Sequence, residues 1–304
     1  NPQYRDKFRY KCKFRIVPLN FGEYDGQKIM DYEEVGVEHK DLSFEDYLYI
    51  RVLAVLVQSL HNGKPFYEFF KFSKKFGIQP ASLLRILFDN ISDSSKNIQK
   101  LINEFVNETK NELWDSEENL IEYYKKDKNY LKLKNGEVGG NLIYKYKSKC
   151  LIESGLDWID YFEQQISKTV IDKQININSA KIIKSELSEI ANFCRLKINA
   201  LLNANVETKP IEDIFNYDIL KWLDDEKENK RLSEYKFPLG GEKLIFEFTK
   251  EQNELFKGVS RKRCLEILLD IGNVKATQKQ FDTWMIEKNH YKKSGKVSKS
   301  RKEN

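Results

Sequence analysis

The stretch KDLSFEDYLYIRVLAVLVQSLHN (40–62) opens polar, becomes almost wholly apolar and stops at Asn62-Gly63. Ser43 is a good helix N-cap, and Asp46 three residues later gives a weaker form of the capping box. Asn62-Gly63 supplies a C-terminal stop. The stretch therefore predicts one helix with defined ends.

The apolar part of this stretch decides between a membrane segment and a core helix. It runs from Ile50 to Leu60 and includes Arg51. A bilayer needs ~20 consecutive apolar residues, which is longer than this run. The sequence thus predicts no membrane span and favours a helix that is buried on most sides.

The composition predicts a folded protein with a mixed surface. The chain is 40% hydrophobic and 13% aromatic, with 52 basic and 47 acidic residues and a net charge of +5. Only 10 of the basic residues are Arg, the usual reader of bases and phosphates, which argues against nucleic-acid binding as the main function. Four cysteines are separated by 138, 44 and 70 positions, which favours reduced thiols and a cytoplasmic protein.

The hydrophobic spacing predicts a mainly α fold, a multi-helix domain with a small antiparallel β element. That element comprises an N-terminal hairpin turning at Asp25-Gly26 and a late strand expected to join it. One long helix is expected from Leu142 to Lys168. The predicted segments are a lead-in (1–13), the hairpin (14–40), a helical domain (41–285) with a loop near 125–141 and a strand near 243–248, and a basic disordered tail (286–304).

The aromatic run FYEFFKF (66–72) allows two interpretations. Interleaved aromatics and cations form stacking platforms for nucleic acid, but on strands or loops. On a helix, Phe66, Phe69 and Phe70 would share one face, which is the spacing of a core. We therefore expect this run to be buried.

No motif in the chain carries a reaction. The histidines His39, His61 and His290 are widely separated, and the single Glu287-x-x-His290 pair falls in the predicted tail. Gly139-Gly140 lacks the spacing of a phosphate-binding loop. No metal or catalytic residue is predicted.

Several segments, taken in order, resemble the C-terminal region of cobalamin-binding-type radical S-adenosylmethionine proteins. The resemblance runs from about Phe14 to near Trp284 and rests on the succession of the segments, none of which is a catalytic signature. They are RIVPLNFGEYDGQKIMDYEEVGVEHKDLSFEDYLYIR (15–51), NGKPFYEFFKFSKKFGIQPASLL (62–84), ELWDSEENLIEYY (112–124), LKNGEVGGNLIYKYKSKCLIESGL (133–156), FNYDILKWLDD (215–225) and LSEYKFPLGGEKLIFEFTKEQ (232–252).

The resemblance implies that the chemistry lies upstream of this chain. In that family a Cys-x3-Cys-x2-Cys loop at the start of a radical barrel holds a [4Fe–4S] cluster, where S-adenosylmethionine binds. This chain has no such loop. No cofactor is expected within it, and the cluster, S-adenosylmethionine and, as a further candidate, cobalamin are expected in upstream domains.

The leading hypothesis is a non-catalytic accessory domain whose partner is its own upstream radical barrel. Exposed apolar surface should then lie near residues 14–60, where that domain would dock. The residues expected to contact substrate or the other domain are Tyr24, Glu34, His39 and Arg51, all near the junction between the hairpin and the first helix of the helical domain.

Two other hypotheses stay open. The chain could be a self-standing enzyme whose site is assembled only by folding, marked by a deep pocket with convergent polar groups. It could also be a weak nucleic-acid-binding module using the Lys-rich segment 125–149 and the tail, which salt would weaken steeply.

Overall fold

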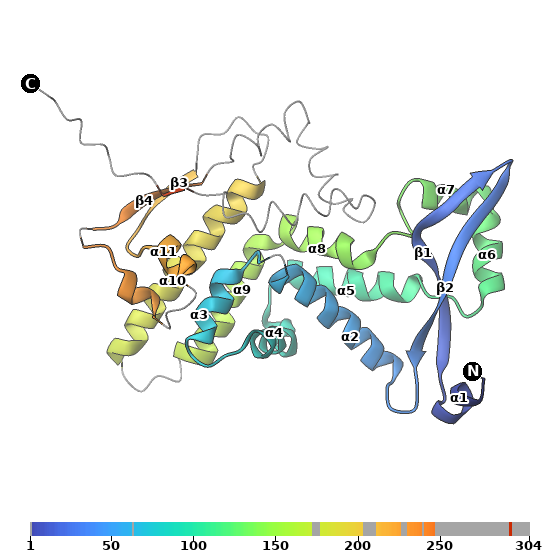
Figure 1. Cartoon of the computed structure of the whole chain (residues 1–304), viewed down its shortest axis with the longest axis horizontal. Helices are drawn as coiled ribbons and strands as arrows, with labels where there is room; N and C mark the ends of the chain where they lie inside the picture. Colours follow the sequence, from blue (N-terminus) through green and yellow to red (C-terminus); the bar gives the residue numbers. More distant parts are fainter. Residues whose placement is uncertain are drawn as a thin grey trace, which may run out of the picture.

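The computed structural model describes residues 2–62, 64–171, 177–202, 211–225, 230–238, 240–246 and 292–293. Within them the chain is mainly helical with two small antiparallel sheets, which confirms the predicted fold class. Figure 1 shows the N-terminal hairpin with α6 and α7 at one end of the molecule and α3, α10, α11, β3 and β4 at the other. We call these ends the hairpin module and the helical body.

The hairpin joins β1 (Lys11–Tyr24) to β2 (Gln27–Glu38). Its turn is the predicted Asp25-Gly26, where both residues have positive φ as a two-residue hairpin turn requires. The strand register shifts between Ile16 and Phe21, a segment that holds Pro18. Proline cannot donate a backbone hydrogen bond to the strand ladder, so the sequence predicts an irregularity at this position.

The hairpin starts earlier than expected. The lead-in was predicted over residues 1–13, but it contains α1 (Pro2–Phe8) and the first residues of β1. Arg5 on α1 pairs with Glu34 on β2, and the carbonyl of Phe8 accepts a hydrogen bond from the Lys40 amide. These contacts fix the first helix to the base of the hairpin.

Two helices cover the hairpin and give it a core of its own: α6 (Glu117–Lys125) and α7 (Asp127–Lys134). This core consists of Ile16, Met30, Leu120, Tyr124, Tyr130 and Leu133. The loop predicted near 125–141 is therefore wrong over α7. Its Lys- and Asn-rich composition conceals two residues, Tyr130 and Leu133, that become buried once the hairpin lies against them.

The opening stretch of the sequence forms α2 (Phe44–Leu56), continued by a π-helical turn, η1 (Val57–His61). Ser43 caps the helix as predicted: its hydroxyl accepts from the Asp46 amide, and the Asp46 carboxylate accepts from the Ser43 amide. The last helical turn ends at Asn62. Both ends of this helix were therefore correctly predicted from the sequence.

Replacing Ser43 by alanine is expected to lower the free energy of unfolding by about 1 kcal/mol, because the Asp46 amide loses its capping partner, the Ser43 hydroxyl. Urea denaturation followed by circular dichroism measures the loss. Ser43→Thr keeps the hydroxyl and should stay close to the native value. Equal losses for the two variants would show that the cap contributes nothing.

The centre of the molecule is a set of helices around α2. They are α4 (Pro80–Asp89), η2 (Ile91–Asp93), α5 (Lys96–Asn111) and α8 (Leu142–Ile152). Their buried residues belong to the main hydrophobic core, which continues into the helical body. The hairpin core shares no buried residue with this main core.

The helical body contains α3 (Tyr67–Lys74), α9 (Gly155–Ile166), η3 (Ser167–Ile171) and α10 (Ile177–Leu202). Phe162 of α9 lies against three aromatic rings of the FYEFFKF run, with centroid distances of 4.9 Å to Phe69, 5.4 Å to Phe66 and 5.6 Å to Phe70. The prediction that this run forms core is confirmed.

The single helix predicted from Leu142 to Lys168 is wrong. The chain breaks between α8 and α9, where the Ser154 hydroxyl donates to the Cys150 carbonyl. A Cβ at Gly155 would lie 3.1 Å from a methyl of Ile198, so glycine permits close packing here. The break allows α8 to pack on α5 while α9 packs on α10.

The late strand does not join the hairpin, which corrects a second expectation. β4 (Glu242–Phe246) pairs with β3 (Ile211–Phe215) and with β5 (Lys292–Lys293) in a separate sheet. Phe215 and Phe246 pack on Phe193 of α10, which holds this sheet on the helical body. Most of the predicted tail, and Phe248, lie outside the described residues.

Two further short helices complete this end of the molecule: α11 (Ile219–Asp224) and η4 (Leu232–Tyr235). The buried Lys71 ammonium of α3 donates to the carbonyls of Trp222, Leu223 and Asp225 at the end of α11. Since a helix C-terminus carries unpaired carbonyls and partial negative charge, a cation there is stabilising.

Candidate functional site

The four residues predicted from the sequence do not form one site. Tyr24 lies at the tip of the hairpin, with its side chain 66% exposed and its ring against Gly22. His39 lies at the opposite end of the hairpin, where its ring centroid is 5.4 Å from that of Tyr10. Its Nδ1 accepts a hydrogen bond from the Asp41 amide. The length of the hairpin therefore separates these two residues.

Glu34 pairs with α1 instead of facing Arg51. Its carboxylate accepts a hydrogen bond of 2.6 Å from Arg5, which lowers the pKa of Glu34. Cys12 lies next to this pair, and burial followed by the hydrogen bond to Glu34 raises the pKa of its thiol. This cluster attaches α1 to the hairpin and leaves the thiol in its unreactive, protonated form at neutral pH.

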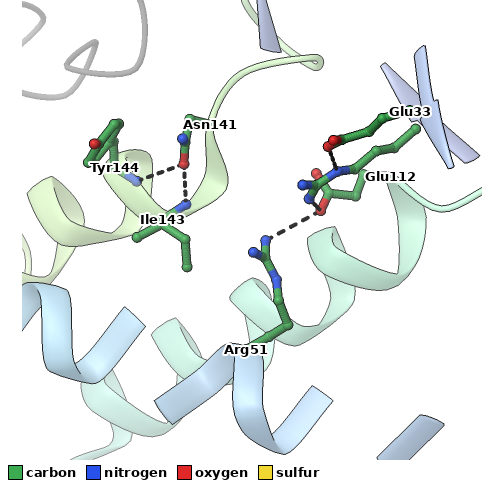
Figure 2. A network of polar contacts seen from close by, with 7 residues as sticks. Glu33, Arg51, Glu112, Asn141, Ile143 and Tyr144 are labelled. Atoms are coloured by element: carbon green, nitrogen blue, oxygen red, sulfur yellow. Dashed lines mark hydrogen bonds and ion pairs between the residues drawn. The ribbon is translucent and has the colours of Figure 1, made fainter. Parts of the chain in front are cut away.

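Arg51 belongs to a second polar cluster, which we call the Glu112 junction: Arg15, Glu33, Arg51 and Glu112. Arg15 donates to Glu33 at 2.7 Å and to Glu112 at 2.8 Å, and Arg51 lies 3.4 Å from the same Glu112 oxygen. Figure 2 shows Glu112 between Glu33 on one side and Arg51 on the other. Residues of two strands and two helices thus meet in one cluster, in which Arg15 and Arg51 share a Glu112 oxygen.

The local structure explains how these side chains come together. Arg15 and Glu33 are direct partners in the ladder of β1 and β2, so their side chains lie on the same face of the hairpin. Glu112 is the C-cap residue of α5, and Arg51 lies in the middle of α2. Glu33 and Glu34 point to opposite faces of β2, as the alternation of a strand requires.

Glu112 is in an unfavourable place for a negative charge. Burial is the main cause that raises its pKa, and the two arginines oppose that effect. Its position at the C-terminus of α5 adds the negative end of the helix dipole. Tyr47 of α2 is half-buried near this cluster, and burial raises the pKa of its hydroxyl. The carboxylate is therefore held in its charged form chiefly by Arg15 and Arg51.

Arg51 makes limited use of its donors. Its side chain is 18% exposed, and its guanidinium lies 5.7 Å from the ring centroid of Phe105. Its Nε is buried without a hydrogen-bond partner among the described residues. The Arg51 guanidinium lies between the Phe105 ring and the shared Glu112 carboxylate. This position suits arginine better than lysine, because the guanidinium is planar.

Glu112→Gln is expected to change how stability depends on pH. A carboxyl whose pKa is higher in the folded chain binds its proton more tightly there, so its contribution is largest at acid pH and is lost as the pH rises through that pKa. Urea titrations should show the native chain losing stability relative to the variant as the pH rises above about 4.

Glu104 on the same helix provides a control of opposite sign. A hydrogen bond from Lys149 lowers the pKa of Glu104, so its contribution is present at neutral pH and is lost as the pH falls. The Glu104→Gln variant should therefore approach the native chain in stability under acid conditions. Slopes of the same sign for the two variants would contradict this account of the Glu112 junction.

A second polar seam joins α5 to α8 beside the junction. The Asn141 side chain caps α8 by accepting from the amides of Ile143 and Tyr144 at 3.0 and 3.4 Å (Figure 2). Along the seam, Glu108 accepts from Lys145 and from the Tyr146 hydroxyl. Burial is the main cause that raises the pKa of Tyr146. These contacts hold α5 and α8 together.

The described cysteines do not fit an iron–sulfur cluster. Cys150 and Cys194 are fully buried in separate helices, while Cys12 lies on the hairpin. Burial raises the pKa of Cys150 to about 12. Within the described ranges there is no group of three or more His, Cys, Asp or Glu side chains placed to hold a metal ion.

A surface pocket of about 480 Å³ lies far from the junction, beside α11 and η4. Lys221, Asp225, Tyr235 and Lys236 are among its lining residues. The Tyr235 hydroxyl donates to Asp225 at 2.7 Å, and burial together with this bond raises the pKa of Tyr235 to about 12. The pocket is polar and charged, unlike the mostly apolar sites that bind small molecules.

The Glu112 junction is suited to fastening the hairpin module to α2 and α5. Its charges balance, and each carboxylate is paired with Arg15. Sequence reasoning selected Arg51 but missed Arg15, Glu33 and Glu112. Arg15 and Glu112 are 97 residues apart, so only the folded chain reveals their pairing.

No described helix has the length and hydropathy of a membrane span. Comparison of the chain with protein families, curated proteins and solved structures finds no match.

Proposed function

We propose that the chain is a non-catalytic accessory domain of a radical S-adenosylmethionine protein of the cobalamin-binding type. It packs on an upstream radical barrel and shapes the access of substrate. In this proposal the [4Fe–4S] cluster, S-adenosylmethionine and cobalamin are held upstream, and the protein is cytoplasmic. The family rests on the ordered resemblance of the sequence, and the docking role rests on the surface of the structure.

The observation that carries the docking role is where apolar side chains are exposed. Among the described residues, six exposed large apolar side chains lie between positions 14 and 60, and Tyr4 and Tyr10 lie just before them. The other five are spread over the rest of the described chain. The six are Leu19, Tyr24, Ile29, Tyr32, Tyr49 and Ile50. This is the region where we expect the upstream domain to dock.

The hairpin module has the form of a projecting arm. Its core is small and separate from the main core, and a polar junction fastens it to the central helices. Such an arm has a large exposed surface and only a small core, so contact with another domain would stabilise it. Tyr24 and Ile29 at its tip are available for such a contact.

The gene provides the most decisive test of the family. The coding sequence that precedes Asn1 should specify a barrel with a Cys-x3-Cys-x2-Cys loop. Purified full-length protein should then bind iron and sulfide in the ratio of a [4Fe–4S] cluster, and substitution of one loop cysteine should abolish that binding. A start codon directly before Asn1, or an upstream domain without this loop, would overturn the proposal.

A further inference from the structure

Helix α2 is apolar on nearly all sides, yet one side of it is uncovered. Ile50 is 49% exposed, and Tyr49 is 38% exposed although its ring also packs on Phe88 of α4. Ala54 is exposed as well, and Leu53 is half-buried. A helix that is hydrophobic all round is normally buried all round. The uncovered side is therefore not explained by the fold of the described chain.

The exposed residues form one continuous stripe along α2. Positions 46, 49, 50, 53 and 54 are three or four residues apart, so they lie on one face of the helix. Leu48, Val52, Val55 and Leu56 lie on the opposite face and are buried in the core. Figure 1 shows α2 running from the base of the hairpin into the centre of the molecule. We call the exposed face the α2 stripe.

The N-terminal end of the α2 stripe carries negative charge. Glu45 and Asp46 are exposed in the first turn of the helix. Hydrogen bonds from the backbone and side chain of Ser43 lower the pKa of Asp46, which keeps it ionised at neutral pH. Arg51 points away from the stripe toward Glu112. The stripe therefore combines an apolar length with an acidic end.

Ile182, another exposed apolar residue, lacks this arrangement. Ile182 of α10 is 45% exposed, but the exposed residues around it are Asn178, Lys181 and Ser185. Apolar residues that are exposed singly are ordinary on protein surfaces, whereas a contiguous patch with a polar rim marks an interaction site. Ile182 is thus a suitable control position.

We propose that the α2 stripe is a docking surface for an amphipathic helix of a protein partner, with basic residues at the end that lies against Glu45 and Asp46. Apolar residues of that helix pack on Tyr49, Ile50 and Leu53, and Ala54 permits close approach. The charges favour an antiparallel arrangement, because Lys residues are stabilising at a helix C-terminus. This inference deepens the proposed function by naming the kind of surface that the barrel would offer.

Two designed helical peptides test the docking surface. They share one apolar stripe and differ only in a C-terminal pair of residues, which is Lys-Lys in one and Glu-Glu in the other. Fluorescence anisotropy at low salt should show the Lys peptide binding at least about tenfold more tightly, a difference of about 1.4 kcal/mol. The preference should shrink as salt is added, because these charges are exposed.

Variants of the chain identify where the peptide binds. Ile50→Asp should weaken binding of the Lys peptide at least about tenfold, while Ile182→Asp should leave it unchanged. Both substitutions are on exposed positions, and equal melting temperatures would establish that both variants are folded. Unchanged binding by Ile50→Asp, equal weakening by Ile182→Asp, or no preference between the peptides would overturn the inference.

These outcomes are separable from those of the proposed function. An upstream Cys-x3-Cys-x2-Cys loop together with no binding at the α2 stripe would reject only the docking surface. Binding at the stripe with no such loop upstream would reject the family and keep the surface.

Discussion

Phe162→Ala is expected to lower the free energy of unfolding by about 3–5 kcal/mol. The Phe162 side chain is fully buried and packs on Phe69 in a stacked geometry at 4.9 Å. Its removal would leave a cavity where α9 meets α3, and the rings of Phe66 and Phe70 would lose their common neighbour. Urea denaturation measures the loss.

Two further variants keep this prediction testable if Phe162→Ala fails to fold. Phe162→Leu retains most of the volume and should lose about 1 kcal/mol. Phe44→Ala removes a ring that is only half-buried and stacks on Tyr47, so it should also lose little. A loss for Phe162→Ala no greater than that for Phe44→Ala would mean that the aromatic cluster does not hold the helical body together.

Glu68→Ala should also lower the free energy of unfolding by about 3–5 kcal/mol. Glu68 is buried in α3 and accepts hydrogen bonds of 2.7 and 2.8 Å from Lys197 on α10. The Cys194 thiol lies 3.5 Å from the same carboxylate. Without Glu68 the Lys197 ammonium would be left largely buried and without its counter-charge, which is the expensive part of breaking a buried pair.

A surface ion pair whose basic residue also lies on α10 gives the matched control. Glu163 pairs with Arg195 of α10 at 2.9 Å but is partly exposed, so Glu163→Ala should lose on the order of 1 kcal/mol or less. The double variant Glu68→Met with Lys197→Met removes both buried charges and should regain most of the stability. Equal losses for Glu68→Ala and Glu163→Ala would contradict the structural role of the buried pair.

Features that depend on neighbouring residues were predicted well from the sequence. The cap at Ser43, the Asp25-Gly26 turn and the helical face of Phe66, Phe69 and Phe70 all follow from contacts within a few positions. The same holds for the mainly α fold class, which rests on the spacing of apolar residues. These features were correct because propensity, capping and packing agree at each of them.

Features that depend on distant partners were missed or wrong. Leu244 and Phe246 form a strand as expected, but β3 pairs with it because Phe193 of α10 anchors both strands. Helix α7 was missed because its sequence is Lys-rich. Its two buried residues, Tyr130 and Leu133, are recognisable as core residues only once they pack against the hairpin. The Glu112 junction required the strand register of β1 and β2, which the irregularity before Phe21 makes difficult to infer.

The candidate site illustrates the same limit. Tyr24, Glu34, His39 and Arg51 were grouped because they lie near one another in sequence, between the strands and α2. A hairpin separates its tip from its base, and alternate residues of a strand face opposite sides. Only Arg51 therefore lies in the Glu112 junction, while the exposed residues nearest to it along α2, Tyr49 and Ile50, were not selected.

The central claim is that the N-terminal region, with the α2 stripe in it, contacts an upstream domain. Hydrogen–deuterium exchange compares the isolated chain with the full-length protein most directly. We expect slower amide exchange in the full-length protein over residues 44–56 and 19–32, and unchanged exchange around Ile182 and Ile214. Exchange that is unchanged over residues 44–56, or slowed only around Ile182 and Ile214, would contradict the account.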